Sequence, residues 1–328
     1  MNSLMESNRV SFNKVNDCKP RIVVKIGSSL LANEKHLTPR YAFIHGLLSD
    51  IATLQDKGYQ VILVSSGSVA LGMNSINSSP EKASIKDKQA AAACGQPILM
   101  HAYKQVALEY GFDIAQVLVT LEDLEDMKRF LNTKNTLERL LERGVMPIVN
   151  ENDTITTEEL RVGDNDRTSA KVAQMVQSEH LVILTCIDGL YDRNPDEEGA
   201  KLVRNLDNVN EYLEAASGPT GLGVGGMLTK LQAANMAQNA GCTTIIARGN
   251  LASPISAVMR GDRIGTICRA HNTPASYWKI WLTDRLSMAG GLIIRQDVSD
   301  KLKDENKGVS CYDVVSTHGS FQKADVLH

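Results

Sequence analysis

Short runs of apolar residues alternate along the chain with longer segments in which apolar positions recur every three or four residues. The short runs predict buried strands, and the longer segments predict amphipathic helices. Strands are expected at residues 21–26, 60–66, 112–119, 145–150, 180–185 and 243–249, and helices at 41–58, 87–111, 135–144, 166–178 and 230–241. Uninterrupted apolar strands separated by helices are typical of a mainly parallel sheet covered by helices on both faces. The predicted fold class is therefore α/β, a three-layer αβα sandwich.

This pattern ends near residue 270. The stretch that follows contains both tryptophans of the chain and then short strand-like runs separated by turn residues. A polar segment precedes the first apolar run. We therefore expect a flexible N-terminal tail (residues 1–19), one large domain (20–270) and a small β-rich segment (271–328), which is short for an independent domain.

Composition narrows the class of protein. The chain has 328 residues, of which 43% are hydrophobic and 22% charged, and its formal net charge is −3. These values favour a soluble globular protein without the positive field that gathers nucleic acid. The six cysteines are irregularly spaced and form no C-x-x-C pair, which argues against zinc and disulfides and for a reducing cytoplasm. No signal peptide or run of eighteen apolar residues is present, so no membrane association is expected.

Polar residues gather where the predicted strands end. In open parallel sheets ligands bind beyond the carboxyl ends of the strands, so these residues are candidates for a site. Lys25 follows an apolar run and precedes a glycine turn, where it could hold an anion or merely extend its charge out of the core. The other strand ends carry residues 65–68 (with Ser66 and Gly67), 150–153, 185–189 (with Thr185 and Cys186) and 248–250.

The sequence GLGVGG at residues 221–226 matches the G-x-G-x-x-G pattern of dinucleotide-binding folds. That pattern requires a buried strand directly before the glycines and an acidic residue after the next strand, and both are missing here. The glycines can instead form a loop that accepts an anion and brings Lys230 to the start of a helix, or they can be a surface linker.

The residues Asp164, Asn165 and Asp166 begin a predicted helix, and three such residues exceed what an N-cap needs. The strand ends together offer two lysines, one acid that could position them, and glycine, amide and hydroxyl donors, but no histidine base and no metal-ligand cluster. Such a set suits phosphoryl transfer, which needs alignment and positive charge. A carboxylate acceptor, with a pKa of about 4.3 for a glutamate side chain, would need no general base.

Eight stretches, in order and spacing, resemble the glutamate 5-kinases, a family with the amino-acid kinase fold. They are VVKIGSSLL, VSSGSVALG, KQAAAACGQPILM, RFLNTKNTLERLL, PIVNENDT, VGDNDRTSA, GLGVGGMLTKLQAA and GTICRAHNTP. The resemblance extends from about residue 20 to residue 275. It implies a transferase that uses ATP, with Mg²⁺ as the metal, to phosphorylate the side-chain carboxylate of L-glutamate, the first step of proline biosynthesis.

The resemblance also implies roles for individual residues. Lys25 would stabilise the transferring phosphoryl group, Lys230 would hold the nucleotide phosphates, and Asp166 would orient both lysines. The implied glutamate-binding residues are Ser66, Asp153 and Asn165, with Gly67, Asn150 and Asp164 near them. The implied nucleotide-binding residues are Lys25, Thr185, Cys186, Val224, Gly225, Gly226, Met227, Leu228, Thr229 and Lys230. Family members commonly have Asp in place of Cys186 and Thr in place of Val224, so contacts with the adenosine part are expected to differ.

The C-terminal segment resembles the beginning of a PUA domain, a β-rich fold also seen in RNA-modifying proteins, and we expect an incomplete copy. Its acidic and basic residues balance, so RNA is not an expected partner. The resemblance further suggests feedback inhibition by proline and a homodimer or homotetramer. Two alternatives stay open: a sister kinase acting on acetylglutamate, aspartate, carbamate or a nucleoside monophosphate, and a non-catalytic regulatory or RNA-binding protein on the same fold.

Overall fold

The computed structural model describes residues 19–33, 36–78, 82–156, 164–193, 195, 197–216, 226–271, 290–295, 298 and 309–320. The chain divides into two compact units, Met1–Pro274 and Ala275–His328. Among the described residues, no helix is both long and apolar enough to cross a membrane.

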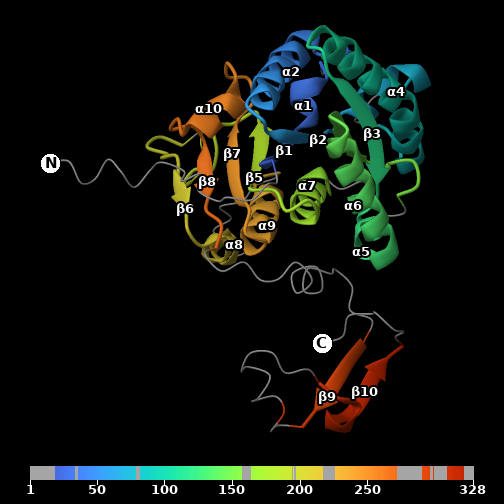
Figure 1. Ribbon diagram of the computed structural model, residues 1–328, viewed down its shortest axis with the longest axis vertical. Coiled ribbons are helices and arrows are strands. Elements are labelled where there is room, and N and C mark those ends of the chain that lie inside the picture. The colour runs from blue at the N-terminus through green and yellow to red at the C-terminus, as the bar shows by residue number, and fades with distance from the viewer. Residues whose placement is uncertain are drawn as a thin grey trace, which may run out of the picture. The chain divides into compact units, whose positions relative to one another are not determined.

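A sheet of eight strands forms the centre of the first unit (Figure 1). Its strands are β1 (Arg21–Ile26), β2 (Gln60–Val64), β3 (Asp113–Val119), β4 (Val145–Glu151), β5 (His180–Thr185), β6 (Asn205–Leu206), β7 (Thr243–Arg248) and β8 (Thr266–Cys268). Their order across the sheet is β3-β4-β2-β1-β5-β7-β8-β6. All neighbouring strands are parallel except β7 and β8, so the sheet is mainly parallel, as the sequence predicts.

Helices cover both faces of this sheet, which confirms the three-layer architecture (Figure 1). They are α1 (Ser28–Leu31), α2 (Tyr41–Asp56), α3 (Ser68–Gly72), α4 (Ile85–Glu109), α5 (Leu121–Glu125), α6 (Met127–Glu142), α7 (Asp164–Met175), α8 (Val209–Ala216), α9 (Gly226–Asn239) and α10 (Pro254–Arg260), with a short 3₁₀ helix, η1 (Met73–Ile76), after α3. α2 packs against α4 and α10 on one face, and α7 packs against α9 on the other.

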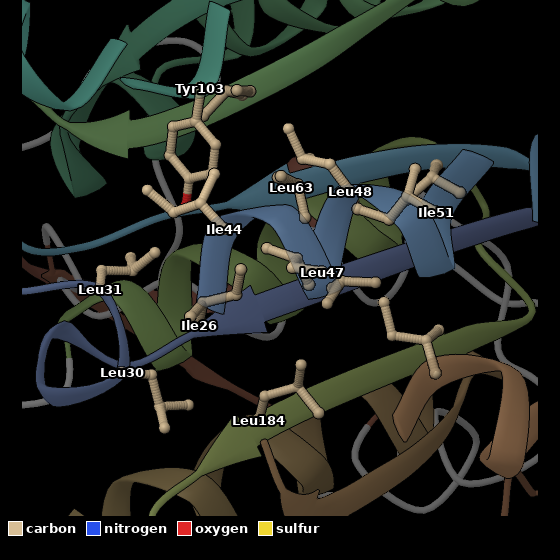
Figure 2. Close-up of a cluster of buried hydrophobic side chains, with 14 of the residues drawn as sticks. Ile26, Leu30, Leu31, Ile44, Leu47, Leu48, Ile51, Leu63, Tyr103 and Leu184 are labelled. Atoms are coloured by element: carbon tan, nitrogen blue, oxygen red, sulfur yellow. The ribbon is translucent and has the colours of Figure 1, made fainter. Parts of the chain in front are cut away.

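Strand alternation in β1 separates the core from the chemistry. Ile22, Val24 and Ile26 are fully buried in the cluster beneath α2, where Tyr103 of α4 also packs (Figure 2). Successive side chains of a strand point to opposite faces, so Val23 and Lys25 face the other layer, which contains α7. One strand therefore supplies apolar side chains to the larger core and a single ammonium group to the opposite face.

Two glycines fix the distance between α3 and α4. A Cβ atom on Gly72 would lie 1.8 Å from the carbonyl oxygen of Ala91, and one on Gly95 would lie 1.8 Å from that of Ser68. The two helices therefore contact each other backbone to backbone. This packing holds α4 against the loop that follows β2, which carries Ser66 and Gly67.

The described helices include short ones that were not predicted, such as α1, α8 and α10, and some predicted helices begin earlier than expected. The helix expected at residues 135–144 begins at Met127, because the carboxylate of Asp126 accepts a hydrogen bond of 2.8 Å from the backbone N–H of Arg129 and caps an earlier turn. The last described element before the glycines of residues 221–226 is the helix α8, and not the strand that a dinucleotide fingerprint requires.

The second unit contains β9 (Gly290–Ile294) and β10 (Val314–Gly319), which pair antiparallel, and a 3₁₀ turn, η2 (Cys311–Asp313). This small antiparallel sheet agrees with the β-rich character expected of the C-terminal segment. Most of the expected N-terminal tail and both tryptophans lie outside the described residues.

Replacing Gly95 with alanine should lower the free energy of unfolding by about 1–3 kcal/mol, since the added methyl group overlaps a backbone carbonyl that cannot move independently. Gly46 is the matched control, because it lies on an exposed part of α2 and a Cβ there meets nothing within 4 Å. Gly46→Ala should raise stability by about 0.5–1 kcal/mol. Urea unfolding of both variants measures the difference, and an equal response would contradict the packing described for α3 and α4.

Candidate active site

A cleft of about 710 Å³ opens at the carboxyl ends of the central strands. Its walls come from the ends of β1, β2, β4 and β5 and from the first turns of α3, α4, α7 and α9. The lining includes Lys25, Ser66, Gly67, Ser68, Lys88, Glu151, Asp153, Asn165, Asp166, Thr185, Cys186, Gly226, Met227 and Lys230. The structure thus brings together side chains from most of the strand ends that the sequence pattern singles out.

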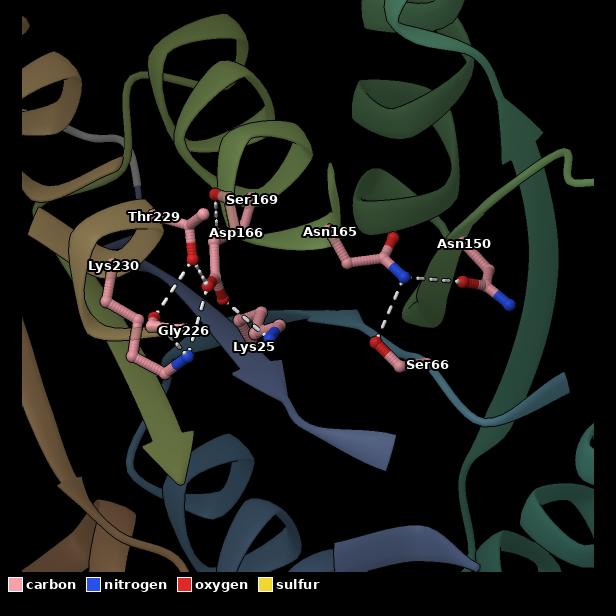
Figure 3. Close-up of polar contacts among 9 residues, drawn as sticks. All are labelled: Lys25, Ser66, Asn150, Asn165, Asp166, Ser169, Gly226, Thr229 and Lys230. Atoms are coloured by element: carbon pink, nitrogen blue, oxygen red, sulfur yellow. Dashed lines mark hydrogen bonds and ion pairs between the residues drawn. The ribbon is translucent and has the colours of Figure 1, made fainter. Parts of the chain in front are cut away.

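Asp166 joins two lysines at the floor of this cleft (Figure 3). One carboxylate oxygen lies 2.6 Å from the Lys25 Nζ, and the other lies 3.2 Å from the Lys230 Nζ. The hydroxyl of Thr229 donates a hydrogen bond of 2.9 Å to the second oxygen. Lys230 also donates to the carbonyl oxygen of Gly226 at 3.0 Å, which fixes its side chain over the first turn of α9. The two ammonium groups therefore converge on one carboxylate from β1 and α9.

Burial makes this ionic group sensitive to its partners. Asp166 is 0% exposed and Lys25 is 5% exposed. Burial alone would raise the pKa of Asp166, but the positive charges of Lys25 and Lys230 outweigh it and hold the pKa below its ordinary value. Burial, together with the charge of Lys230, lowers the pKa of Lys25 despite the nearby carboxylate. Two lysines against one carboxylate give the three side chains a formal surplus of one positive charge.

Amide groups form a second cluster beside this one (Figure 3). The Asn165 side-chain N–H₂ donates to the Ser66 hydroxyl at 3.0 Å and to the Asn150 carbonyl oxygen at 3.2 Å. Asn150 in turn donates to the Gln96 Oε1 at 2.9 Å. The Asn165 Oδ1 is buried and has no hydrogen-bond partner among the described residues. Asn165 is thus held by Ser66, which follows β2, and by Asn150 of β4, while its Oδ1 is an acceptor that a ligand could use.

Ser68 and Gly67 position the remaining wall of this end of the cleft. The Ser68 hydroxyl donates to a carboxylate oxygen of Asp153 at 3.1 Å and so links the start of α3 to the turn after β4. Gly67 has a φ of +100°, a left-handed conformation that favours glycine. This conformation lets the chain turn from β2 directly into α3, with Gly67 lining the cleft.

Only some of the predicted nucleotide-binding residues line the described cleft. Thr185, Cys186, Gly226 and Met227 line the cleft, and Cys186 is exposed. Thr229 contacts Asp166 and not the cavity, and Leu228 is not part of the lining. Val224 and Gly225 lie outside the described residues, as does the side chain of Asp164, whose backbone begins α7.

Of the residues that build this site, Gln96 is not among the predicted ones, whereas Ser68 and Glu151 lie at strand ends that the sequence pattern singles out. Gln96 supports Asn150, and the Ser68 hydroxyl supports Asp153. Glu151 lines the cleft and accepts a hydrogen bond of 3.3 Å from the Thr168 hydroxyl on α7. Gln96 lies within the stretch KQAAAACGQPILM, but its role follows from its contact in space with Asn150, 54 residues away in the chain.

Among the described residues, no group of three or more His, Cys, Asp or Glu side chains could hold a metal ion. Asp166 is engaged by two lysines. Mg²⁺ usually binds proteins through one or two carboxylates, with substrate phosphates and water as its other ligands. The carboxylates lining the cleft fit a metal that arrives with a nucleotide and do not form a cage of their own.

The chain is similar to known proteins over most of its length. The model of the family described as "Amino acid kinase family" matches residues 20–248. The glutamate 5-kinase of Bordetella petrii is 40% identical over 310 residues, which are 94% of this chain and 82% of that protein. The glutamate 5-kinase of Caulobacter vibrioides is 38% identical over 312 residues, again 94% and 82% of the two chains.

Solved structures show the same fold at lower identity. Carbamate kinase from Giardia lamblia bound to AMP-PNP is 14% identical and has a TM-score of 0.56, over 77% of this chain and 99% of its own. The isopentenyl phosphate kinase of T. acidophilum is 17% identical with a TM-score of 0.53, over 76% and 100%. At these identities the likeness concerns the arrangement of helices and strands.

Replacing Asp166 with asparagine should lower the free energy of unfolding at pH 7 by about 3–5 kcal/mol, because two ammonium groups then lose their shared carboxylate. The folded-state pKa of Asp166 is lowered, so its contribution to stability is present above the unfolded value of 3.8 and is lost as the pH falls through the folded value. Urea unfolding between pH 7 and pH 3 should therefore show the two proteins converging at low pH.

The control for this prediction is the double variant Asp166→Asn with Lys25→Met. Removing the unpaired buried ammonium should recover part of the lost stability. A double variant less stable than Asp166→Asn alone would mean that the buried charge is not the source of the loss.

Proposed function

The chain belongs to the amino acid kinase family, and we propose that it transfers the γ-phosphoryl group of ATP to the side-chain carboxylate of L-glutamate. The products are ADP and L-glutamyl 5-phosphate, so the chain is a phosphotransferase of the first step of proline biosynthesis. The glutamate 5-kinases that it resembles at 37–40% identity over 94% of its length support this function. The observation that carries it is the pair of lysines held by Asp166 at the floor of the cleft.

The reaction needs charge and alignment more than proton transfer. An oxygen of the glutamate side-chain carboxylate attacks the γ-phosphorus, the bond between that phosphorus and the β–γ bridging oxygen breaks, and ADP leaves. The attacking carboxylate is ionised at neutral pH, because its ordinary pKa is about 4.3. The absence of a histidine among the residues that line the described cleft is compatible with this step.

The two lysines divide the negative charge of the transition state. Lys25 comes from the centre of the sheet, and in our proposal it stabilises the oxygens of the migrating phosphoryl group. Lys230 stands at the start of α9, where backbone N–H groups and the helix dipole also favour phosphate, and it holds the nucleotide phosphates. Asp166 touches neither reactant in this scheme. It keeps both ammonium groups aimed at one point and compensates part of their charge before substrates bind.

The amide cluster is proposed as the acceptor end of the cleft. Asp153 supplies a negative charge for the α-ammonium group of glutamate, and Ser66 and Asn165 supply hydrogen bonds. The buried Asn165 Oδ1 supports this assignment, because it is an acceptor without a partner among the described residues. Gly67 lines the cleft beside this cluster, and Asn150 supports it from behind.

The nucleotide end is proposed to consist of Thr185, Cys186 and residues 224–230. Mg²⁺ bound to the ATP phosphates would withdraw charge from the group being transferred. Lys25 and Lys230 are the residues of this chain that would face those phosphates. An exposed thiol at position 186 cannot accept a hydrogen bond from ribose or adenine as strongly as the family's usual aspartate, so affinity for the adenosine part should rest more on the loop before α9.

Further parts of the proposal concern regulation and assembly. From the resemblance we also propose that proline inhibits the protein and that it assembles into a dimer or tetramer. We further propose a cytoplasmic location and an incomplete PUA-like segment at residues 271–328. RNA binding is not part of the proposed function.

Incubation of the protein with ATP, Mg²⁺ and L-glutamate should produce ADP, and hydroxylamine should trap the acyl phosphate as a hydroxamate. Acetylglutamate, aspartate, carbamate and UMP, assayed in parallel, should react much more slowly. Turnover of one of these acceptors in preference to glutamate would replace the proposed substrate. Inactivity of a folded preparation toward every acceptor would count against a kinase function.

Replacing Lys230 with alanine should lower kcat by roughly two orders of magnitude or more, because a preorganised positive charge is lost from the transition state. Lys201→Ala is the control, since Lys201 is exposed and lies outside the cleft. Steady-state rates with saturating glutamate test the prediction. A variant with the wild-type kcat would show that Lys230 does not face the transferring group.

A further inference from the structure

A third lysine lines the cleft, apart from the pair on Asp166. Lys88 lies in the first turns of α4 and is partly buried. Its ammonium group has no hydrogen bond or ion pair with any residue that the structure describes. A partly desolvated charge is unfavourable unless an opposite charge compensates it. Among the described residues that line the cleft, Lys88 is the cation without a carboxylate of its own.

The stability of α4 does not account for a lysine at this position. The neighbouring carboxylate, Asp87, is occupied by the helix cap, because it accepts hydrogen bonds of 2.9 Å and 2.7 Å from the backbone N–H and the hydroxyl of Ser84. Lys88 is the fourth residue of the helix. A positive charge so close to a helix N-terminus opposes the helix dipole.

The position of Lys88 on α4 directs it toward the acceptor end. Lys88 and Gln96 are eight residues apart and thus on one face of the helix, separated by about 12 Å along its axis. Gln96 supports the amide cluster through Asn150. Between them, the Gln89 side chain donates a hydrogen bond of 3.0 Å to the Thr156 carbonyl oxygen, which ties the first turns of α4 to the turn that carries Asp153.

We propose that Lys88 binds the α-carboxylate of the acceptor and thereby selects an α-amino acid over a simple carboxylic acid. This inference rests on the function proposed above. Glutamate presents a side-chain carboxylate, an α-ammonium group and an α-carboxylate. The first must lie at Lys25 for transfer, and the second is matched by Asp153. The α-carboxylate then requires a cation at the outer part of the acceptor end, where α4 places Lys88.

The test compares two acceptors in two variants. 4-Aminobutanoate is glutamate without its α-carboxylate. Lys88→Met should lower kcat/KM for L-glutamate by about 10- to 100-fold, mainly through a higher KM, because a charge-assisted contact is lost in the ground state as well as the transition state. The same substitution should leave kcat/KM for 4-aminobutanoate nearly unchanged. If turnover of this acceptor is slow, its inhibition constant against glutamate gives the same comparison.

Lys86→Met is the matched control, since Lys86 is exposed on the first turn of α4 and does not line the cleft. It should leave the kinetics of both acceptors unchanged. The KM for ATP should be unchanged in both variants, and the melting temperature of Lys88→Met should equal or slightly exceed that of the wild type.

Three other outcomes would contradict the inference. An equal loss for both acceptors would assign Lys88 to a different part of the reaction, and no loss for glutamate would exclude it from the acceptor site. Either result overturns the inference while the wild-type activity upholds the proposed function. A wild-type protein inactive toward glutamate would overturn both.

Discussion

The site depends on one buried carboxylate shared by two ammonium groups. Asp166 can remain ionised without contact with water because Lys25 and Lys230 approach it from two sides. Neither lysine could be kept in this part of the molecule without it, because an unpaired buried charge costs several kcal/mol. Two lysines against one carboxylate give the cluster a formal positive charge, which is what a phosphoryl group requires. Folding requires that the charge of the buried lysines be compensated, whereas phosphate binding requires that positive charge remain. One carboxylate shared by two lysines meets both requirements.

The geometry of this cluster follows from regular secondary structure. Alternation along β1 sends Lys25 to the face opposite the larger core, and the first turn of α7 brings Asp166 to the same face. The proposed acceptor end depends on a less regular feature, the contact of α3 and α4 through Gly72 and Gly95. That contact sets how closely α4 approaches α3, which begins just after β2. The sheet therefore fixes the position of Lys25 and Asp166, and helix packing fixes the proposed acceptor end.

This difference explains what could be predicted from the sequence. The strands, the parallel sheet and the polar strand ends are encoded locally, so Lys25 and Asp166 could be recognised as candidates from their neighbours in the chain. Gln96 could not, because it lies within a helix and acquires its role only from Asn150, 54 residues away. The antiparallel strand β8 could not be predicted from the sequence either, since its three residues carry no pattern that sets the direction of the strand. The early start of α6 depended on a cap at Asp126.

The solved structures of similar fold are named for kinases of carbamate, isopentenyl phosphate and UMP, and they are only 13–17% identical to this chain. Acceptors of such different size and charge on one fold mean that the sheet itself cannot choose the acceptor. The choice must lie in side chains that can change without moving the strands. In the proposed scheme the wall formed by α4 meets that condition, because Gln96 of α4 supports Asn150 while glycines hold α4 against α3. In that scheme a new side chain on this face would alter which acceptor fits and would leave the two lysines on Asp166 in place.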